Sequence, residues 1–154
     1  MKRLKIVTVG DYRKVVASQH IRKGELVIDM SHGEEIPIAE MDDGYYAFQI
    51  REDLFLGSRE ADAGDITCFI NHSCDPNLAF RDGDTLLTNI RHIQAGEELC
   101  WDYSTSIDDG VFNMNCGCNS GNCRGTVSSF GQLDGATQQR LIPLAIRYIQ
   151  EKYR

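Results

Sequence analysis

The chain has 154 residues, which is the usual size of a single domain. Its 16 basic and 23 acidic side chains give a formal charge of −7. That balance argues against direct binding of nucleic acid or docking on an anionic membrane, because both need a surplus of Lys and Arg. No apolar run reaches the roughly 20 residues of a membrane helix, and the run 6–10 is too short for a signal peptide. We therefore expect an intracellular protein, cytoplasmic or nuclear, that is not secreted.

Short runs rich in Val, Ile, Leu and aromatic residues, each ending near Gly or Asp, predict a series of β-strands. They cover residues 4–9, 14–18, 25–30, 45–50, 78–80, 85–90 and 97–101. Asp82-Gly83 favours a tight hairpin turn between two of them. Pro143 suits the first turn of a helix whose apolar face includes Ile146 and Ile149. The sequence thus predicts an α+β, mostly β, fold with a C-terminal helix that packs on the domain or joins a homodimer.

Charge is spread unevenly along these elements. Residues 1–24 hold 7 basic and 1 acidic side chains (+6), whereas residues 25–65 hold 2 basic and 12 acidic ones (−10). An acidic stretch of this kind is either a solvated surface that aids solubility or a docking surface for a basic partner.

Two segments, 20–26 and 92–99, resemble each other in sequence. The first reads His-Ile-Arg-Lys-Gly-Glu-Leu and the second His-Ile-Gln-Ala-Gly-Glu-Glu-Leu. Gene duplication is one explanation, and shared turn chemistry ahead of a strand is the other.

Three of the six cysteines, Cys116, Cys118 and Cys123, lie within eight residues of a loop rich in Gly, Asn and Ser. In a reducing compartment such spacing favours a zinc site, because tetrahedral zinc prefers thiolates. The fourth position is filled by water, by Cys74 or by His72, and spacing alone does not choose among them. The alternative is that all six thiols are unliganded. Cys68 and Cys100 stand next to apolar residues and are interpreted as small buried side chains.

Three motifs follow one another in order. The first is Asn71-His72-Ser73-Cys74-Asp75-Pro76-Asn77, the second is Gly-Glu-Glu-Leu-Cys-Trp-Asp-Tyr at 96–103, and the third is the Cys-x-Cys-x4-Cys segment at 116–123. Together they resemble the SET-domain protein lysine methyltransferases that carry a post-SET zinc segment. The resemblance covers roughly residues 4 to 126.

The resemblance implies small curved antiparallel sheets in which 71–77 and 96–103 cross in a knot-like arrangement. It implies S-adenosylmethionine on one face and a channel for a lysine of a basic protein substrate on the other. It further implies one structural zinc ion held by Cys74, Cys116, Cys118 and Cys123. The chain then divides into a SET domain at 1–110, with an acidic insert region at 25–65, a post-SET zinc segment at 111–127 and a tail with a helix at 128–154.

Roles for individual residues also follow from the resemblance. Tyr103 matches the tyrosine at the methyl-transfer centre, and Asn71 and His72 match the pair that contacts the cofactor. Tyr46, with Tyr45 as the alternative, matches the tyrosine that lines the lysine channel.

Two aromatic residues complete the expected site. Trp101 stands two residues before Tyr103, at a position that sets the number of methyl groups added. Since indole is bulky, we expect few additions. Phe112 is expected to cover the adenine ring.

The chain departs from the family at several positions, including one functional motif. Where the family has Gly-x-Gly, this sequence reads Tyr12-Arg13-Lys14. The two larger side chains either hinder the methionine end of the cofactor or contact it differently, and Arg13 or Lys14 is expected to pair with the cofactor carboxylate. The leading hypothesis is a lysine methyltransferase. The alternative is a catalytically silent SET-like module that binds peptide and zinc but has weak affinity for the cofactor.

Overall fold

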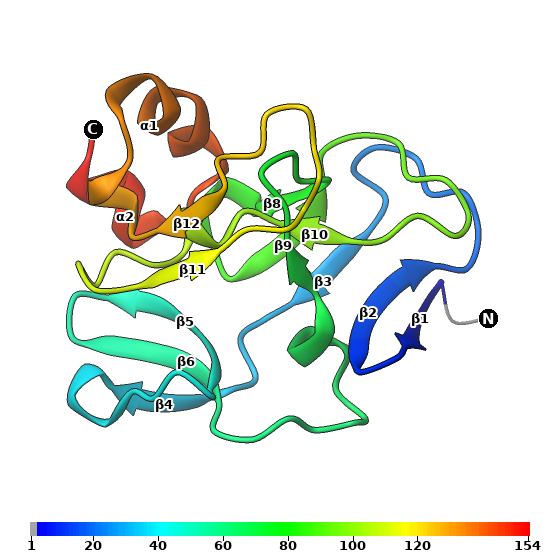
Figure 1. The fold of residues 1–154 in the computed structure, drawn as a ribbon, viewed down its shortest axis with the longest axis horizontal. Coiled ribbons are helices and arrows are strands. Elements are labelled where there is room, and N and C mark those ends of the chain that lie inside the picture. Colours follow the sequence, from blue (N-terminus) through cyan, green and yellow to red (C-terminus); the bar gives the residue numbers. More distant parts are fainter. Residues whose placement is uncertain (1–2) are drawn as a thin grey trace.

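The computed structural model describes residues 3–154, and the strands in this range form five small sheets (Figure 1). β1 (Leu4–Val9) and β2 (Tyr12–Ala17) make an antiparallel hairpin. A central sheet has the order β3-β9-β8, with β3 (Val27–Asp29), β9 (Leu86–Asn89) and β8 (Leu78–Phe80). A second sheet has the order β4-β6-β5, with β4 (Glu34–Pro37), β6 (Leu54–Ser58) and β5 (Tyr46–Arg51).

The remaining strands are short. β7 (Asn71–His72) and β10 (Cys100–Trp101) pair in parallel, and β11 (Asn113–Asn115) pairs with β12 (Thr126–Ser128) in antiparallel. The two helices, α1 (Gly135–Leu141) and α2 (Arg147–Lys152), lie together at the end of the molecule opposite the β1–β2 hairpin (Figure 1). The fold is therefore mostly β, as the sequence predicts.

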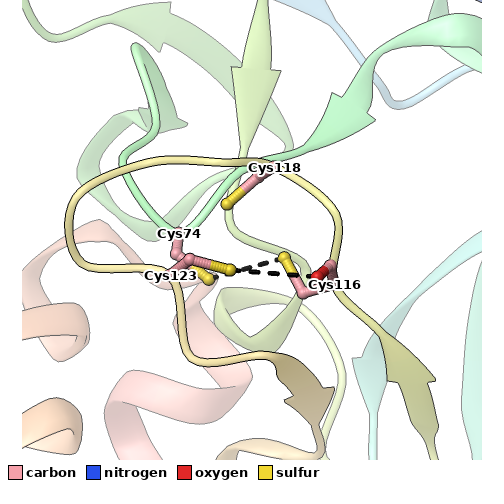
Figure 2. A group of neighbouring side chains, drawn as sticks. All are labelled: Cys74, Cys116, Cys118 and Cys123. Carbon is pink, nitrogen blue, oxygen red and sulfur yellow. Dashed lines mark hydrogen bonds between the residues drawn. The ribbon is translucent and has the colours of Figure 1, made fainter.

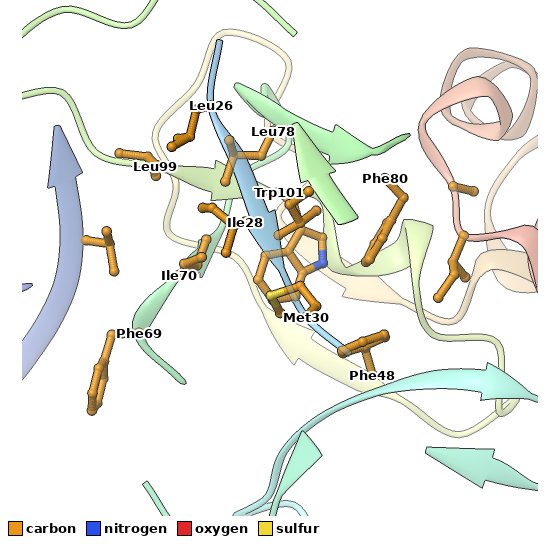
Figure 3. Packing of buried hydrophobic residues seen from close by; sticks show 14 of the residues in the cluster. Leu26, Ile28, Met30, Phe48, Phe69, Ile70, Leu78, Phe80, Leu99 and Trp101 are labelled. Atoms are coloured by element: carbon orange, nitrogen blue, oxygen red, sulfur yellow. The ribbon is translucent and has the colours of Figure 1, made fainter. Parts of the chain in front are cut away.

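The main hydrophobic core joins most of these pieces, and Ile36, Phe55 and Ile107 form a second, smaller cluster. The buried side chains of the main core come from β2, from the central sheet, from β10 and from α2, and they include Val15, Leu87, Trp101 and Ile149. Around β3, Ile28 and Met30 pack among aromatic and aliphatic side chains of the neighbouring segments (Figure 3). Since Ile146 and Ile149 are buried in this core, the apolar side of the C-terminal helix packs on its own chain.

Several predicted strands are confirmed within one residue at each end: 4–9, 45–50, 78–80 and 85–90. β2 begins two residues earlier than predicted, β3 is shorter, and only the last two residues of 97–101 form a strand. The predicted turn exists, and Asp82 and Gly83 both adopt positive φ (52° and 74°). However, β8 and β9 pair only as far as Phe80 and Leu87, so the turn sits within a longer loop.

The prediction of a helix beginning at Pro143 is wrong. Pro143 lies in a short 3₁₀ turn at Ile142–Leu144, and the next two residues, Ala145 and Ile146, have extended ψ angles of 157° and 153°. The helix α2 therefore begins only at Arg147, and α1 was not predicted at all. α1 begins after Asp134, whose carboxylate accepts a hydrogen bond from the Thr137 amide at 3.0 Å.

The two similar segments form the same turn. In each, a glycine with positive φ (Gly24 and Gly96) precedes a glutamate whose carboxylate accepts a bond from the amide three residues earlier, at 2.8 Å for Glu25 and 2.9 Å for Glu97. The segments also meet, because Ile21 and Ile93 exchange backbone hydrogen bonds of 2.9 Å. Shared turn chemistry therefore accounts for the resemblance between them.

The core position of α2 leads to a stability prediction. Replacing Ile149, which is fully buried, by Ala is expected to lower the free energy of unfolding by about 2–5 kcal/mol, since it removes a packed side chain and leaves a cavity. Replacing the exposed Glu151 of the same helix by Ala is expected to change it by less than about 0.5 kcal/mol. Urea unfolding of both variants measures the difference, and equal values would show that α2 does not hold the core together.

Candidate functional site

Four cysteines gather between the first motif and the C-terminal loop (Figure 2). Cys74 lies just after β7, and Cys116, Cys118 and Cys123 lie in the loop between β11 and β12. Their four sulfur atoms are all within 4.8 Å of one another, and the Cys74 and Cys116 sulfurs are 3.8 Å apart. Among the described residues, Cys68 and Cys100 stand outside this cluster.

This cluster fits a structural zinc ion. Zinc–sulfur bonds of about 2.3 Å in a tetrahedron separate neighbouring sulfurs by about 3.8 Å, which is the distance between Cys74 and Cys116. Of the two side chains considered for the fourth position, Cys74 belongs to the cluster. His72 does not: its Nδ1 accepts the Tyr103 amide at 3.1 Å, and its Nε2 lies 3.4 Å from the Cys74 sulfur as a neighbour of that ligand. Four cysteines leave no open position for substrate, so such a site is structural.

An ion pair connects the cysteine loop to the second motif. Both Arg124 terminal nitrogens donate to the carboxylate of Asp102, at 2.6 and 2.8 Å, and the Asp102 side chain is fully buried. The Arg124 amide also donates to the Cys74 sulfur at 3.4 Å. Arg124 thus contacts the cysteine cluster and the residue that precedes Tyr103. Sequence reasoning missed both residues, although Arg124 directly follows Cys123.

His72 and Tyr103 are held together at the crossing of the first two motifs. β7 and β10 pair so that His72 lies beside Trp101. Burial lowers the pKa of His72 to about 4, so its ring is neutral at pH 7 and its Nδ1 can accept the Tyr103 amide. The Tyr103 hydroxyl donates to the Ile70 carbonyl at 3.0 Å. Burial raises the pKa of Tyr103 far above its usual value, so this hydroxyl stays protonated.

A cavity of about 560 Å³, the large cavity, opens on one side of Tyr103. Tyr45, Tyr46, Trp101 and Phe112 also line it. The Trp101 ring lies 4.8 Å from the Tyr103 ring, and its Nε1 donates to the Ser106 hydroxyl at 3.2 Å. The three side chains predicted for the lysine channel therefore share one cavity with Tyr103.

Tyr45 and Tyr46 differ in their contacts. The Tyr45 hydroxyl accepts a bond from Arg59 at 3.4 Å, and the Arg59 guanidinium stacks over its ring at 5.4 Å. Tyr46 packs edge-on against Phe69 at 6.4 Å and is 40% exposed. Tyr46 is thus the more accessible of the two at the cavity wall.

The rim of the large cavity is acidic. Four carboxylates line it, from Glu34, Asp43, Asp62 and Asp65, and all belong to the acidic stretch 25–65. His32 also lines the cavity, and its Nε2 lies 2.7 Å from the Asp65 carboxylate. That hydrogen bond raises the pKa of His32.

A second hollow of about 420 Å³, the small hollow, lies on the side of the cysteine loop. Tyr12, His72, Glu98, Cys100 and Cys118 are among its lining residues. Burial raises the pKa of Cys100 to about 12, so this thiol is neutral. Phe112, which was predicted to cover the adenine ring of the cofactor, lines the large cavity and is not among the residues that line the small hollow.

Of the residues predicted to bind the cofactor, His72 lines the small hollow, and Asn71 and Lys14 contact Glu98 in its wall. The Asn71 amide donates to the Arg13 carbonyl at 2.9 Å and to Glu98 at 3.0 Å. The Arg13 guanidinium stacks over the Phe69 ring at 4.4 Å, whereas the Lys14 ammonium lies 3.7 Å from the Glu98 carboxylate. Sequence reasoning missed Glu98, which stands inside the second motif.

Residues 12–104 match the sequence model of the SET-domain family, and the chain therefore belongs to this family. The chain is 31% identical over 139 residues to histone-lysine N-methyltransferase trr of Drosophila melanogaster, and 30% identical over 144 residues to human histone-lysine N-methyltransferase 2B. Each match covers 80% of this chain but only 6% and 5% of the relative, so the chain spans a small part of their length.

Solved structures share the fold. The methyltransferase domain of human SETMAR matches with a TM-score of 0.62 at 22% identity, over 79% of this chain and 56% of that one. KRYPTONITE, in complex with mCHG DNA and SAH, matches with a TM-score of 0.56 at 24% identity, over 79% of this chain and 28% of that one. In residues 3–154 none of the helices has the length and apolar character to span a bilayer.

The cysteine cluster predicts one zinc ion per chain. Replacing Cys74 by Ser is expected to abolish stoichiometric zinc and to loosen the loop between β11 and β12, because three thiolates remain and metal binding is coupled to folding here. Replacing Cys68 by Ser is the matched control and is expected to keep the metal. Elemental analysis together with limited proteolysis tests both variants. Equal zinc content in the two would refute the assignment.

Proposed function

We propose that this protein transfers a methyl group from S-adenosylmethionine to the side-chain amine of a lysine in a basic protein. The observation that supports this most directly is the position of Tyr103. Tyr103 lines the large cavity, and its amide donates to Nδ1 of His72, which lines the small hollow. It therefore connects the two recesses, as expected for a residue between a donor and an acceptor of one group.

The small hollow suits the cofactor by size and charge. Pockets for small molecules usually measure about 300–1,000 Å³, and Asp75, Glu97 and Glu98 outnumber Arg91 along its wall. The cofactor carries a sulfonium and an ammonium against one carboxylate, so its net charge is positive. When bound, it supplies an electrophilic methyl on a positive sulfur.

The reaction needs a neutral lysine. With an ordinary pKa of about 10.4, only about one lysine in 2,500 is neutral at pH 7, which costs roughly 4.6 kcal/mol. Partial desolvation in the aromatic-lined cavity favours the neutral amine, and the proton leaves to solvent. The cofactor would supply the methyl group, with a methylated ammonium on the substrate and a neutral thioether as the products.

Tyr103 acts on that step through its oxygen. Because its proton is engaged by the Ile70 carbonyl at 3.0 Å, its lone pairs remain free to accept contacts from the amine and the polarised methyl. The His72 ring packs edge-on against the Tyr103 ring at 5.4 Å, and the Ile70 carbonyl accepts the hydroxyl proton, so the hydroxyl needs little reorganisation.

The acidic rim of the large cavity indicates the class of substrate. Carboxylates at Glu34, Asp43 and Asp62 complement a basic polypeptide and penalise an acidic one. The relatives are named for histone-lysine methylation, and a KRYPTONITE structure contains an H3(1-15) peptide with SAH. We assign this chain the same class of substrate, a histone or another lysine-rich protein of the nucleus or cytoplasm.

Zinc has a structural role in this proposal. Residues 111–127 form the zinc segment, residues 1–110 the SET domain and residues 128–154 the tail. With zinc held by its four thiolates, Arg124 fixes Asp102 and hence Tyr103 against the first motif.

The competing function is a peptide-binding module without catalysis. It is favoured by the bulky Tyr12 and Lys14, which replace two glycines beside the small hollow. Turnover by the native protein separates the two functions.

Tyr103→Phe is the experiment that tests the catalytic assignment. The variant loses the hydroxyl but keeps the ring, so SAH affinity is expected to stay within about twofold while methyl transfer to a lysine-rich peptide falls about 10²–10³-fold. Tyr148→Phe, the same change on α2, is the control and is expected to keep full activity. An undiminished rate in Tyr103→Phe would remove Tyr103 from this role, and no turnover by the native protein would favour the silent module.

Trp101 is expected to limit the number of methyl groups. Its indole packs 4.8 Å from the Tyr103 ring and narrows the cavity where a methylated amine would have to turn. We predict mainly monomethyl product from the native protein and more dimethyl and trimethyl product from Trp101→Phe. Mass spectrometry of the peptide product measures this, and efficient trimethylation by the native protein would contradict it.

A further inference from the structure

Tyr12 and Lys14, which stand where the family has glycines, both contact the carboxylate of Glu98. Tyr12 and Lys14 are two residues apart on β2 and therefore point to the same face of the strand. The Tyr12 hydroxyl donates to Oε1 of Glu98 at 2.8 Å, and the Lys14 ammonium lies 3.7 Å from Oε2. The two substitutions are thus one coupled arrangement, with Glu98 as its centre.

A third group completes the arrangement. The Asn71 amide donates to the same Glu98 Oε1 at 3.0 Å. Burial and the bond to Glu98 raise the pKa of Tyr12 above its usual value, so its hydroxyl remains a donor. Glu98 is therefore fixed in place beside the small hollow, with a cation close to one of its oxygens.

Glu98 and Lys14 can each form further hydrogen bonds. A carboxylate offers about four acceptor positions and an ammonium three donors. Glu98 uses two acceptor positions for hydrogen bonds from Tyr12 and Asn71, and its contact with Lys14 exceeds hydrogen-bond length. Glu98 lines the small hollow and its side chain is 24% exposed. Lys14 stands behind the lining residues, but its side chain is 30% exposed and its ammonium lies beside Glu98, so it is within reach of a ligand that contacts Glu98.

We propose that Lys14 and Glu98 form a charged clamp for the zwitterionic amino-acid end of the cofactor. The Lys14 ammonium binds the α-carboxylate and the Glu98 carboxylate binds the α-ammonium, in place of the backbone contacts that the family's glycines allow. This inference depends on the proposed function, since it assumes that the small hollow binds S-adenosylmethionine. It makes Tyr12 a positioning residue that holds Glu98.

Calorimetric titration of the full zinc-loaded chain tests the clamp without measuring turnover. Two probes are compared: SAH, which has the amino-acid end, and 5′-methylthioadenosine, which lacks it. The native protein is expected to bind SAH at least about tenfold more tightly, the effect of one charge-assisted hydrogen bond. Lys14→Gln and Glu98→Gln are each expected to weaken SAH about tenfold and to leave 5′-methylthioadenosine unchanged.

Arg91→Gln is the matched control, because Arg91 pairs with Glu97 in the wall of the same hollow. It is expected to leave the ratio of the two affinities unchanged. Zinc content and urea unfolding confirm that each variant is folded.

The outcomes separate the two proposals. Equal affinity of the native protein for both probes, or a loss of SAH affinity in Arg91→Gln as large as in the clamp variants, overturns the clamp but leaves the cofactor site. Tighter SAH binding in Lys14→Gln or Glu98→Gln would show that these side chains obstruct the hollow, which also overturns the clamp. If the native protein binds neither probe, the proposed methyltransferase function fails together with the clamp.

Discussion

The parallel pairing of β7 with β10 is the constraint on which the candidate site depends. It joins only two residues of each strand, yet it sets His72 beside Trp101 and brings Cys74 and Tyr103 to the same crossing. So short a pairing contributes few hydrogen bonds of its own. Contacts outside the strands, such as the Ser73 amide to the Trp101 carbonyl at 3.1 Å, extend it.

The Asp102–Arg124 ion pair secures this crossing from the side of the cysteine loop. Asp102 is fully buried and has a bidentate partner, so removing Arg124 would leave an uncompensated buried charge, which typically costs about 3–5 kcal/mol. Four thiolates with Zn²⁺ carry a net charge of −2, and the Arg124 amide already touches the Cys74 sulfur. One arginine thus balances two centres of negative charge, which couples the metal site to the segment carrying Tyr103.

Much of this could be predicted from local sequence signals. Apolar runs gave four strands to within a residue, and cysteine spacing gave three of the four clustered thiols. β6 was missed, although Leu54–Leu56 is an apolar run that ends at a glycine, Gly57. The structure explains that glycine, since a Cβ there would overlap the Tyr46 carbonyl. Phe112 could not be assigned to the large cavity from sequence, because its place depends on how the loop after Asp109 folds back against the second motif.

The shared core also constrains how the protein forms during synthesis. Val15 of β2 and Ile149 of α2 are buried in the same cluster, and Ile21 pairs with Ile93 across a long stretch of chain. Contacts between such distant residues slow folding, because loops must close before the contacts can form. The core can therefore close completely only after α2 has been synthesised. A nascent chain without α2 leaves part of this apolar cluster uncovered, which favours aggregation.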